Sequence, residues 1–181
     1  MSLIQSLPPE FRQRCEAIAT EQRSLLRVRA FEALSADTLA AKLGATLFTP
    51  DQVPNLEPEQ LAVLLASDGW SGAIISDRPL WIVYNPRHAP TRRESNLMHE
   101  IAHVLLDHKP VGFDPVTGLP KRKQNNEDEA TYLGGCLQIP KRGLLWATQR
   151  KILLPQIAVH FGASEAMVQF RSNVTDVPLK C

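Results

Sequence analysis

The chain has 181 residues, of which 44% are hydrophobic and 22% are charged, and its formal net charge at pH 7 is +1. These values are ordinary for a single soluble globular domain, which here would cover residues 1–181 and bury a core without disulfides. The small net charge gives no general attraction to nucleic acid, and no stretch approaches the roughly 18 apolar residues of a membrane span.

The cysteines and the amino terminus both indicate the cytoplasm. Cys15, Cys136 and Cys181 are far apart and form no CxxC pair, so we expect neither a disulfide framework nor a thiolate zinc site. The amino-terminal stretch MSLIQSLPPEFRQR lacks the basic start and apolar run of a secretory signal. We therefore expect a cytoplasmic protein with no anchor.

The beginning of the chain, at about 8–44, predicts an N-terminal helical segment. Apolar residues recur at helical spacing over 9–34, and Ser35 or Asp37 then caps a second helix that Gly44 ends. This segment carries no residues that suggest chemistry.

The next part of the chain predicts a small sheet. Residues 72–76 (GAIIS) and 80–84 (LWIVY) are β-branched and aromatic, and the turn at 77–79 makes them a hairpin. A short strand is expected at 45–48 and a helix at 58–67. The fold class is therefore α+β, mostly helical, with a small antiparallel sheet of about three strands.

The stretch 97–108, LMHEIAHVLLDH, has a spacing that suits chemistry. His99 and His103 stand four residues apart, which on a helix places both imidazoles on one face, about one turn apart, as one metal ion requires. Glu100 lies at the edge of that face, where its carboxylate can deprotonate a bound water. This is the HExxH arrangement of zinc hydrolases.

The context of the motif indicates a helix. Thr91 with Glu94 forms a predicted capping box after Pro90. A separate apolar stripe follows at helical spacing, made of Leu97, Ile101, Val104 and Leu105. The alternative to a metal site is an ordinary helix that happens to carry two histidines.

The strand that directly precedes this helix is a candidate for substrate binding. An edge strand that borders a metal cleft can hold an extended peptide by backbone pairing. The residues concerned are Leu80, Trp81, Ile82, Val83 and Tyr84. A plain core strand explains the same residues equally well.

A third ligand is expected in the helix predicted over 125–140, which follows a loop at 109–126. Zinc hydrolases commonly use two histidines and one carboxylate and leave the fourth position to water, so Glu127 or Glu129 is the natural third ligand. An acidic first turn is also favourable against the helix dipole, which is the structural alternative.

Two glycines interrupt the same predicted helix. Gly134 and Gly135 each cost a helix about 1 kcal/mol relative to alanine, which indicates close approach to another helix. The metal helix is the expected neighbour.

The segment 141–174 is largely helical, and Ala158, Gly162 and Val168 fall where helix-turn-helix units place a small residue, a turn glycine and a core residue. Its second helix offers Arg171 as its only basic residue, so we interpret the unit as a packing module, and binding to DNA is the alternative.

Taken together, these motifs resemble the ImmA/IrrE family of bacterial and phage metallopeptidases. The resemblance covers about 37–171 and is carried by HEIAHVLLDH at 99–108 and by EDEA at 127–130. It implies a compact zincin with the small sheet beside the HExxH helix.

By this resemblance, His99, His103 and Glu127 would bind zinc, one ion per chain, and Glu100 would be the general base. Glu127 is preferred over Glu129 because the ligand in similar patterns stands three residues before an alanine. Manganese is the alternative metal.

Family members often act beside a helix-turn-helix repressor, which they cleave or otherwise relieve. The predicted function is thus a zinc-dependent metallo-endopeptidase that hydrolyses a peptide bond in a repressor or antitoxin encoded nearby. The alternative is a non-catalytic, metal-containing regulator or toxin-antitoxin component that acts by binding protein or DNA. The intact Glu100 favours the peptidase, because a structural site has no use for a base.

Two features of the site stay open at this stage. Thr131 stands where the family often has Asn or Asp, so we expect weaker support of the metal ligands. A donor for the oxyanion is also expected, and its candidates are His88, His108, Tyr84 and Tyr132.

Overall fold

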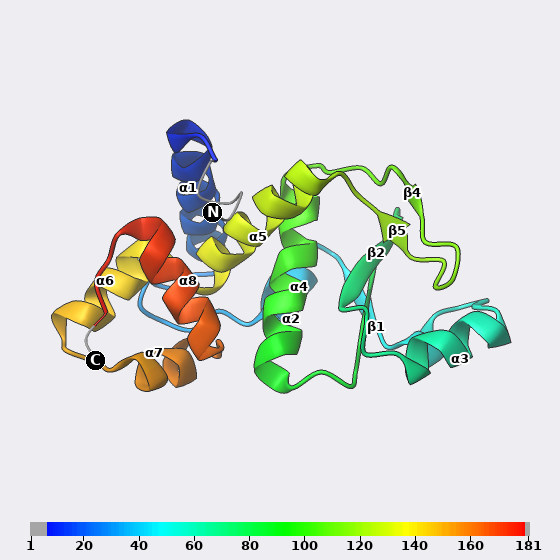
Figure 1. The fold of residues 1–181 in the computed structure, drawn as a ribbon. Helices are drawn as coiled ribbons and strands as arrows, with labels where there is room; N and C mark the ends of the chain where they lie inside the picture. The colour runs from blue at the N-terminus through cyan, green and yellow to red at the C-terminus, as the bar shows by residue number, and fades with distance from the viewer. Residues whose placement is uncertain (1–6, 180–181) are drawn as a thin grey trace.

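The computed structural model describes residues 7–179 (Figure 1). Its α-helices are α1 (Pro9–Leu25), α2 (Ala36–Lys42), α3 (Pro58–Ala66), α4 (Pro90–Leu105), α5 (Gln124–Gln138), α6 (Lys141–Gln149), α7 (Leu154–Phe161) and α8 (Glu165–Thr175). The strands are β1 (Thr46–Phe48), β2 (Gly72–Asp77), β3 (Leu80–Tyr84), β4 (Gly112–Phe113) and β5 (Pro120–Lys121), and η2 (Pro50–Gln52) is a 3-10 turn. The predicted α+β class is confirmed. Cys181 and the first six residues of the amino-terminal stretch lie outside the described residues.

The helices and the sheet occupy different parts of the molecule. Figure 1 shows α1, α6, α7 and α8 at one end, the sheet with α3 and the β4–β5 hairpin at the other, and α4 and α5 crossing between them. None of the helices within 7–179 combines the length and the apolar character that crossing a bilayer requires.

The three-stranded sheet has the order β1-β3-β2 and is mixed. β2 pairs antiparallel with β3, as the hairpin pattern predicts, whereas β1 pairs parallel with β3, with Leu47 opposite Ile82. The expectation of a purely antiparallel sheet is therefore wrong for β1. A parallel pair needs a long connection, here through α3, and nothing local in the sequence reports that pairing.

This order also corrects the prediction for the strand Leu80–Tyr84. β3 is the central strand, so its backbone is paired on both sides and is not free to bind a peptide. β2 lies at the edge of the sheet, on the side that contacts α4. A candidate for peptide pairing is thus β2.

The core centres on the packing of α4 against α5. Leu97 and Ile101 of the predicted stripe are fully buried with Leu133 and Leu137 of α5, and the rest of the stripe packs partly buried against them. A side chain at Gly134 would lie 3.2 Å from backbone atoms of α4, so the expected close approach to the metal helix is confirmed at this position.

Gly135 serves a different neighbour. A Cβ added there would lie 2.9 Å from Arg171 and 3.1 Å from Phe170, both in α8. The two glycines therefore let α5 approach two helices at once, one on each side. The metal helix is the neighbour of Gly134 alone.

The start of α4 differs from the predicted capping box. The helix begins at Pro90, with Ala89 as the N-cap residue and no side-chain cap, so Thr91 already lies inside the first turn. The Glu94 carboxylate instead accepts a hydrogen bond from the backbone amide of Ala36, at the start of α2. This contact fixes α2 to the metal helix.

The α7–α8 unit packs as a helix-turn-helix. Gly162 ends α7 in the left-handed conformation, with φ of 62°, and Ala158 and Val168 are buried on either side of the turn. Arg171 is fully buried and forms an ion pair with Glu16 of α1. The basic residue of α8 is therefore turned into the protein and does not offer a contact to DNA.

We predict that Gly134→Ala lowers the free energy of unfolding by about 1 kcal/mol. The added methyl would press on the backbone of α4, which cannot rotate away, and overpacking of about 1–3 kcal/mol outweighs the gain of about 1 kcal/mol in helix propensity. Urea unfolding would measure the loss. Gly112→Ala is the control, because a Cβ at Gly112 meets nothing within 4 Å; equal stability of Gly134→Ala and wild type would contradict the packing argument.

Candidate metal centre

Two helices bring three predicted ligands together. His99 and His103 project from α4, and Glu127 projects from the first turn of α5. The His99 Nε2 atom lies 3.1 Å from His103 Nε2 and 3.1 Å from Glu127 Oε2, and His103 Nε2 lies 3.3 Å from Glu127 Oε1. One ligand atom from each residue thus lies within 4.8 Å of the other two.

The remaining ring nitrogens already have partners. His99 Nδ1 lies 3.3 Å from the hydroxyl of Thr131, and His103 Nδ1 lies 2.9 Å from His108 Nδ1. His108 Nε2 in turn lies 3.0 Å from Glu129 Oε2. The proton arrangement that satisfies all three contacts has His99 donating to Thr131, His103 to His108, and His108 to Glu129.

This arrangement fits a divalent cation. With the Nδ1 atoms of His99 and His103 protonated, both Nε2 atoms present lone pairs towards each other and towards the Glu127 carboxylate. Three acceptors then converge without a proton between them, which is favourable around a cation. Two imidazoles and one carboxylate are also the ligand set of many catalytic zinc sites, whose fourth position is left to water.

The contacts separate the roles of the two glutamates that the sequence leaves open. Glu129 holds His108 and lies outside the group of three ligand atoms, whereas Glu127 reaches both histidines. Thr131, where the family often has Asn or Asp, still gives His99 a hydrogen-bonding partner. Weaker support than Asn or Asp would give at this position stays a prediction.

The ionisation of the ligands suits metal binding. Burial raises the pKa of Glu127, but the neighbouring His103 and His99 outweigh burial and hold the pKa well below its ordinary value. Burial lowers the pKa of His103 to about 4, against an opposing hydrogen bond with Glu127. At neutral pH the carboxylate is charged and the His103 imidazole is neutral, which is the state that coordinates a metal.

Glu100, the predicted base, lies beside the ligands at the edge of the sheet. Glu100 is 6% exposed, and burial raises the pKa of its carboxyl group, against the lowering effect of His99 and Arg122. A Cβ added at Gly72, the first residue of β2, would lie 3.2 Å from Glu100 Cγ, so the strand runs directly against the base.

Arg122 is a site residue that sequence reasoning missed. It follows β5, its side chain is 5% exposed, and its Nη1 atom lies 3.8 Å from Glu100 Oε2. Its Nε and the Glu100 Oε2 atom are both buried without a hydrogen-bond partner. In the sequence Arg122 is one of three consecutive basic residues in a loop, and no spacing rule connects it with the HExxH helix.

A cleft of about 380 Å³ opens at this centre. Its walls include His99, Glu100 and Glu127 from the helices, and Ser71 and Gly72 from the start of the edge strand. The described residues that line the cleft do not include the predicted substrate strand, Leu80, Trp81, Ile82, Val83 and Tyr84. They also do not include the other oxyanion candidates, His88, His108 and Tyr132.

Those oxyanion candidates are engaged elsewhere. His108 is held between His103 and Glu129, and the buried Tyr132 ring lies under the Arg171 guanidinium, 5.4 Å from it. His88 contacts a residue of the cleft wall, because its Nδ1 atom lies 2.9 Å from the Asn96 side chain.

Comparison with known proteins supports the motif. The sequence profile of the IrrE N-terminal-like domain, a peptidase family, matches residues 64–173, which include all of α4 and α5. This match confirms the resemblance to the ImmA/IrrE family. The comparison with curated proteins and the comparison with solved structures both found no match.

We predict that Glu129→Gln weakens zinc binding about 10-fold to 100-fold, because it removes the charge that orients His108 and, through it, His103. Competition with a chromophoric chelator would measure the affinity. Asp128→Asn is the matched control, since the Asp128 side chain accepts a hydrogen bond only from the Gln124 side chain within residues 7–179. An equal loss in both variants would show that the His108 contact does not support the metal.

A second prediction concerns the metal-free protein. The His103 pKa is about 4 in the folded state and 6.5 in the reference state, so between these values the unfolded chain binds more protons than the folded one. Stability is therefore complete above about pH 6.5 and is lost as the pH falls towards 4. The free energy of unfolding of wild type should therefore fall as the pH is lowered from about 6.5 towards 4. Urea unfolding in the presence of a chelator should show that this fall is smaller by about 1–3 kcal/mol in His103→Gln. An identical dependence of stability on pH in wild type and His103→Gln would show that His103 does not cause the loss of stability at low pH.

Proposed function

Because the chain belongs to the peptidase family of the IrrE N-terminal-like domain, we propose that it is a zinc-dependent endopeptidase acting on a protein partner. The observation that carries this proposal is the convergence of His99, His103 and Glu127 with a buried carboxylate, Glu100, beside them. A structural metal site usually fills all four positions with protein ligands and has no use for a base, whereas three ligands and a neighbouring carboxylate are typical of a catalytic site. Manganese is the alternative metal, and metal analysis separates the two.

Glu100 supplies the acid–base chemistry of this proposal. A divalent ion held by the three ligands would lower the pKa of a bound water and polarise the carbonyl of the substrate. Burial raises the pKa of Glu100, which makes its carboxylate a stronger base towards a water proton. The same group can return that proton to the nitrogen of the leaving amine. The positive charge of Arg122, 3.8 Å from Glu100 Oε2, favours the charged form of Glu100 and so opposes part of this upward shift.

Two features support an extended protein segment as the substrate. β2 is an edge strand whose first residue, Gly72, lies at the cleft, and an edge strand can pair with a peptide backbone. The β4–β5 hairpin, which also positions Arg122, exposes Val111, Phe113 and Val116 at 58%, 68% and 65%. Exposed apolar groups of this kind favour contact with another protein.

We propose a helix-turn-helix repressor or an antitoxin encoded nearby as that partner. This part of the proposal rests on the resemblance to the ImmA/IrrE family. The rival function is a metal-containing regulator that binds the same partner without cutting it. Binding is common to both functions, so only turnover distinguishes them.

The first experiment is metal analysis of the purified protein by mass spectrometry. We expect about one zinc ion per chain in wild type, as a single three-ligand site requires, and loss of the metal in Glu127→Ala. Asp128→Ala, one residue further along α5, should retain it. Absence of metal after reconstitution with zinc would overturn the proposal.

The second part measures turnover. Incubation with the repressor or antitoxin encoded beside the gene should yield fragments that mass spectrometry can identify. Glu100→Gln should bind the metal normally and slow cleavage about 10²-fold to 10⁴-fold, the range for loss of a general base. Cleavage at the wild-type rate by Glu100→Gln would exclude Glu100 as the base. Metal binding with no cleavage by wild type would instead favour the regulator.

A further inference from the structure

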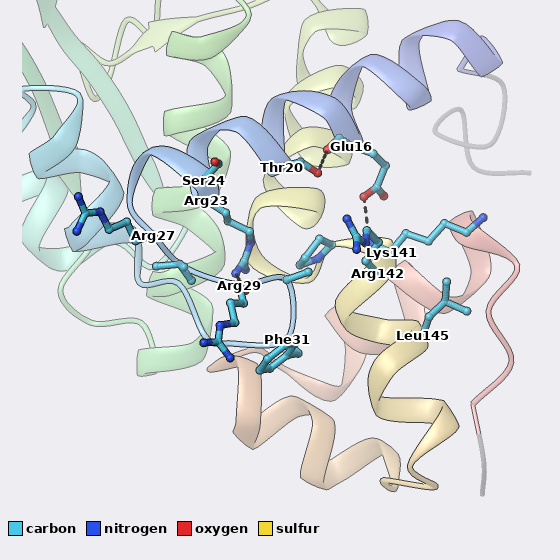
Figure 2. Close-up of a pocket in the computed structure, with 13 residues that line it drawn as sticks. Glu16, Thr20, Arg23, Ser24, Arg27, Arg29, Phe31, Lys141, Arg142 and Leu145 are labelled. Atoms are coloured by element: carbon cyan, nitrogen blue, oxygen red, sulfur yellow. Dashed lines mark hydrogen bonds between the residues drawn. The ribbon is translucent and has the colours of Figure 1, made fainter.

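A second cavity lies at the other end of α5 from the metal ligands. It has a volume of about 650 Å³ and lies between the last turns of α1, the loop that follows, and the start of α6 (Figure 2). No residue lines both this cavity and the metal cleft. The cavity is therefore a separate candidate site.

The charge around this cavity is strongly one-sided. The basic residues that line it include Arg27 and Arg29 from the loop after α1 and Lys141 and Arg142 from α6, and Figure 2 shows the Arg27 guanidinium turned away from the other three. Within residues 7–179, none of these four side chains takes part in an ion pair. The acidic residue of the lining, Glu16, already pairs with the buried Arg171 and accepts the Lys141 amide at 3.0 Å.

A buried guanidinium adds to this charge. Arg23 lines the cavity, is 2% exposed, and donates through its Nη atoms to the carbonyls of Arg29, Glu32, Leu137 and Gln138. Its Nε is buried without a partner, and no carboxylate pairs with it among the described residues. Burial lowers the pKa of Arg23 to about 10, against the opposing effect of the Glu32 carboxylate.

The remaining wall is apolar. Val28, Phe31, Pro140 and Leu145 line it, and the Phe31 ring is held in place by stacking on Trp146, with ring centroids 5.3 Å apart. A volume of about 650 Å³ lies within the range of small-molecule sites, about 300–1,000 Å³. The cavity thus combines fixed apolar surface with a cationic rim.

We propose that this cavity binds a phosphorylated small molecule of nucleotide size. The planar forks of Arg29 and Arg142 suit the oxygens of a phosphate group, and the body of the ligand packs against Phe31 and Leu145. The charge complementarity favours an anion, and the bounded volume favours a small molecule over a protein segment. This site is independent of the proposed peptidase activity.

Isothermal titration calorimetry with adenosine monophosphate, adenosine and inorganic phosphate tests the proposal on the full chain. We expect adenosine monophosphate to bind more tightly than either of its parts, because only it fills both the apolar and the cationic surfaces. Arg29→Glu and Arg142→Glu should each weaken its binding about 10-fold or more, which corresponds to the loss of a charge-assisted hydrogen bond. Arg92→Glu, an exposed arginine on α4 outside the cavity, should bind as wild type does.

The controls separate this site from the metal centre. His99→Ala should leave the affinity for adenosine monophosphate unchanged, whereas a loss in that variant would mean that the phosphate binds at the metal and would overturn the proposal. Equal binding of adenosine, an equal loss in Arg92→Glu, or no saturable binding of adenosine monophosphate would also overturn it. So would tighter binding of a hexaglutamate peptide, which would assign the cavity to an acidic protein segment. Thermal unfolding of each variant confirms that it is folded.

Discussion

The metal centre depends on one close contact between two helices. At Gly134, α5 lies against the backbone of α4 at the position of Met98 and His99, with no side chain between the two helices. Glu127 stands seven residues earlier on α5, about two helical turns away, and therefore on the same side of the helix. The contact that sets the distance between the helices thus also sets how far the carboxylate reaches towards the histidines. The fully buried leucines along both helices hold that distance.

Hydrogen bonds around the ligands determine which atoms face the centre. An imidazole can present only one lone pair when its other nitrogen carries the proton, and Thr131 and His108 occupy the Nδ1 sides of His99 and His103. Glu129 accepts a hydrogen bond from His108, which in turn contacts His103. Two glutamates two residues apart on one helix therefore differ in role: Glu127 contacts the ligand histidines directly, and Glu129 contacts His108. Arg122, which follows β5, places a buried positive charge 3.8 Å from Glu100 Oε2.

The sequence predicted what is local and left open what depends on distant segments. The spacing of His99 and His103 and the apolar stripe of α4 follow from helix geometry alone, and both are confirmed in the structure. Glu127 and Glu129 could not be separated without the family pattern, because their roles depend on where His108 lies after the helix has ended. The position of β3 at the centre of the sheet depends on the parallel pairing of β1, across more than thirty residues. Arg122 reaches Glu100 only because a short hairpin folds back, and no periodicity records that.

The charges at the two ends of α5 explain why this helix can be both a structural and a functional element. Glu127 lies in its first turn, where a carboxylate stabilises the positive end of the helix dipole by about 0.3–1 kcal/mol. At the other end, Arg23 donates to the carbonyls of Leu137 and Gln138, which have no partners within the helix. An acidic first turn that suits the dipole is therefore no argument against a metal ligand. The same carboxylate stabilises the isolated helix and, once α5 packs on α4, completes the group of ligands.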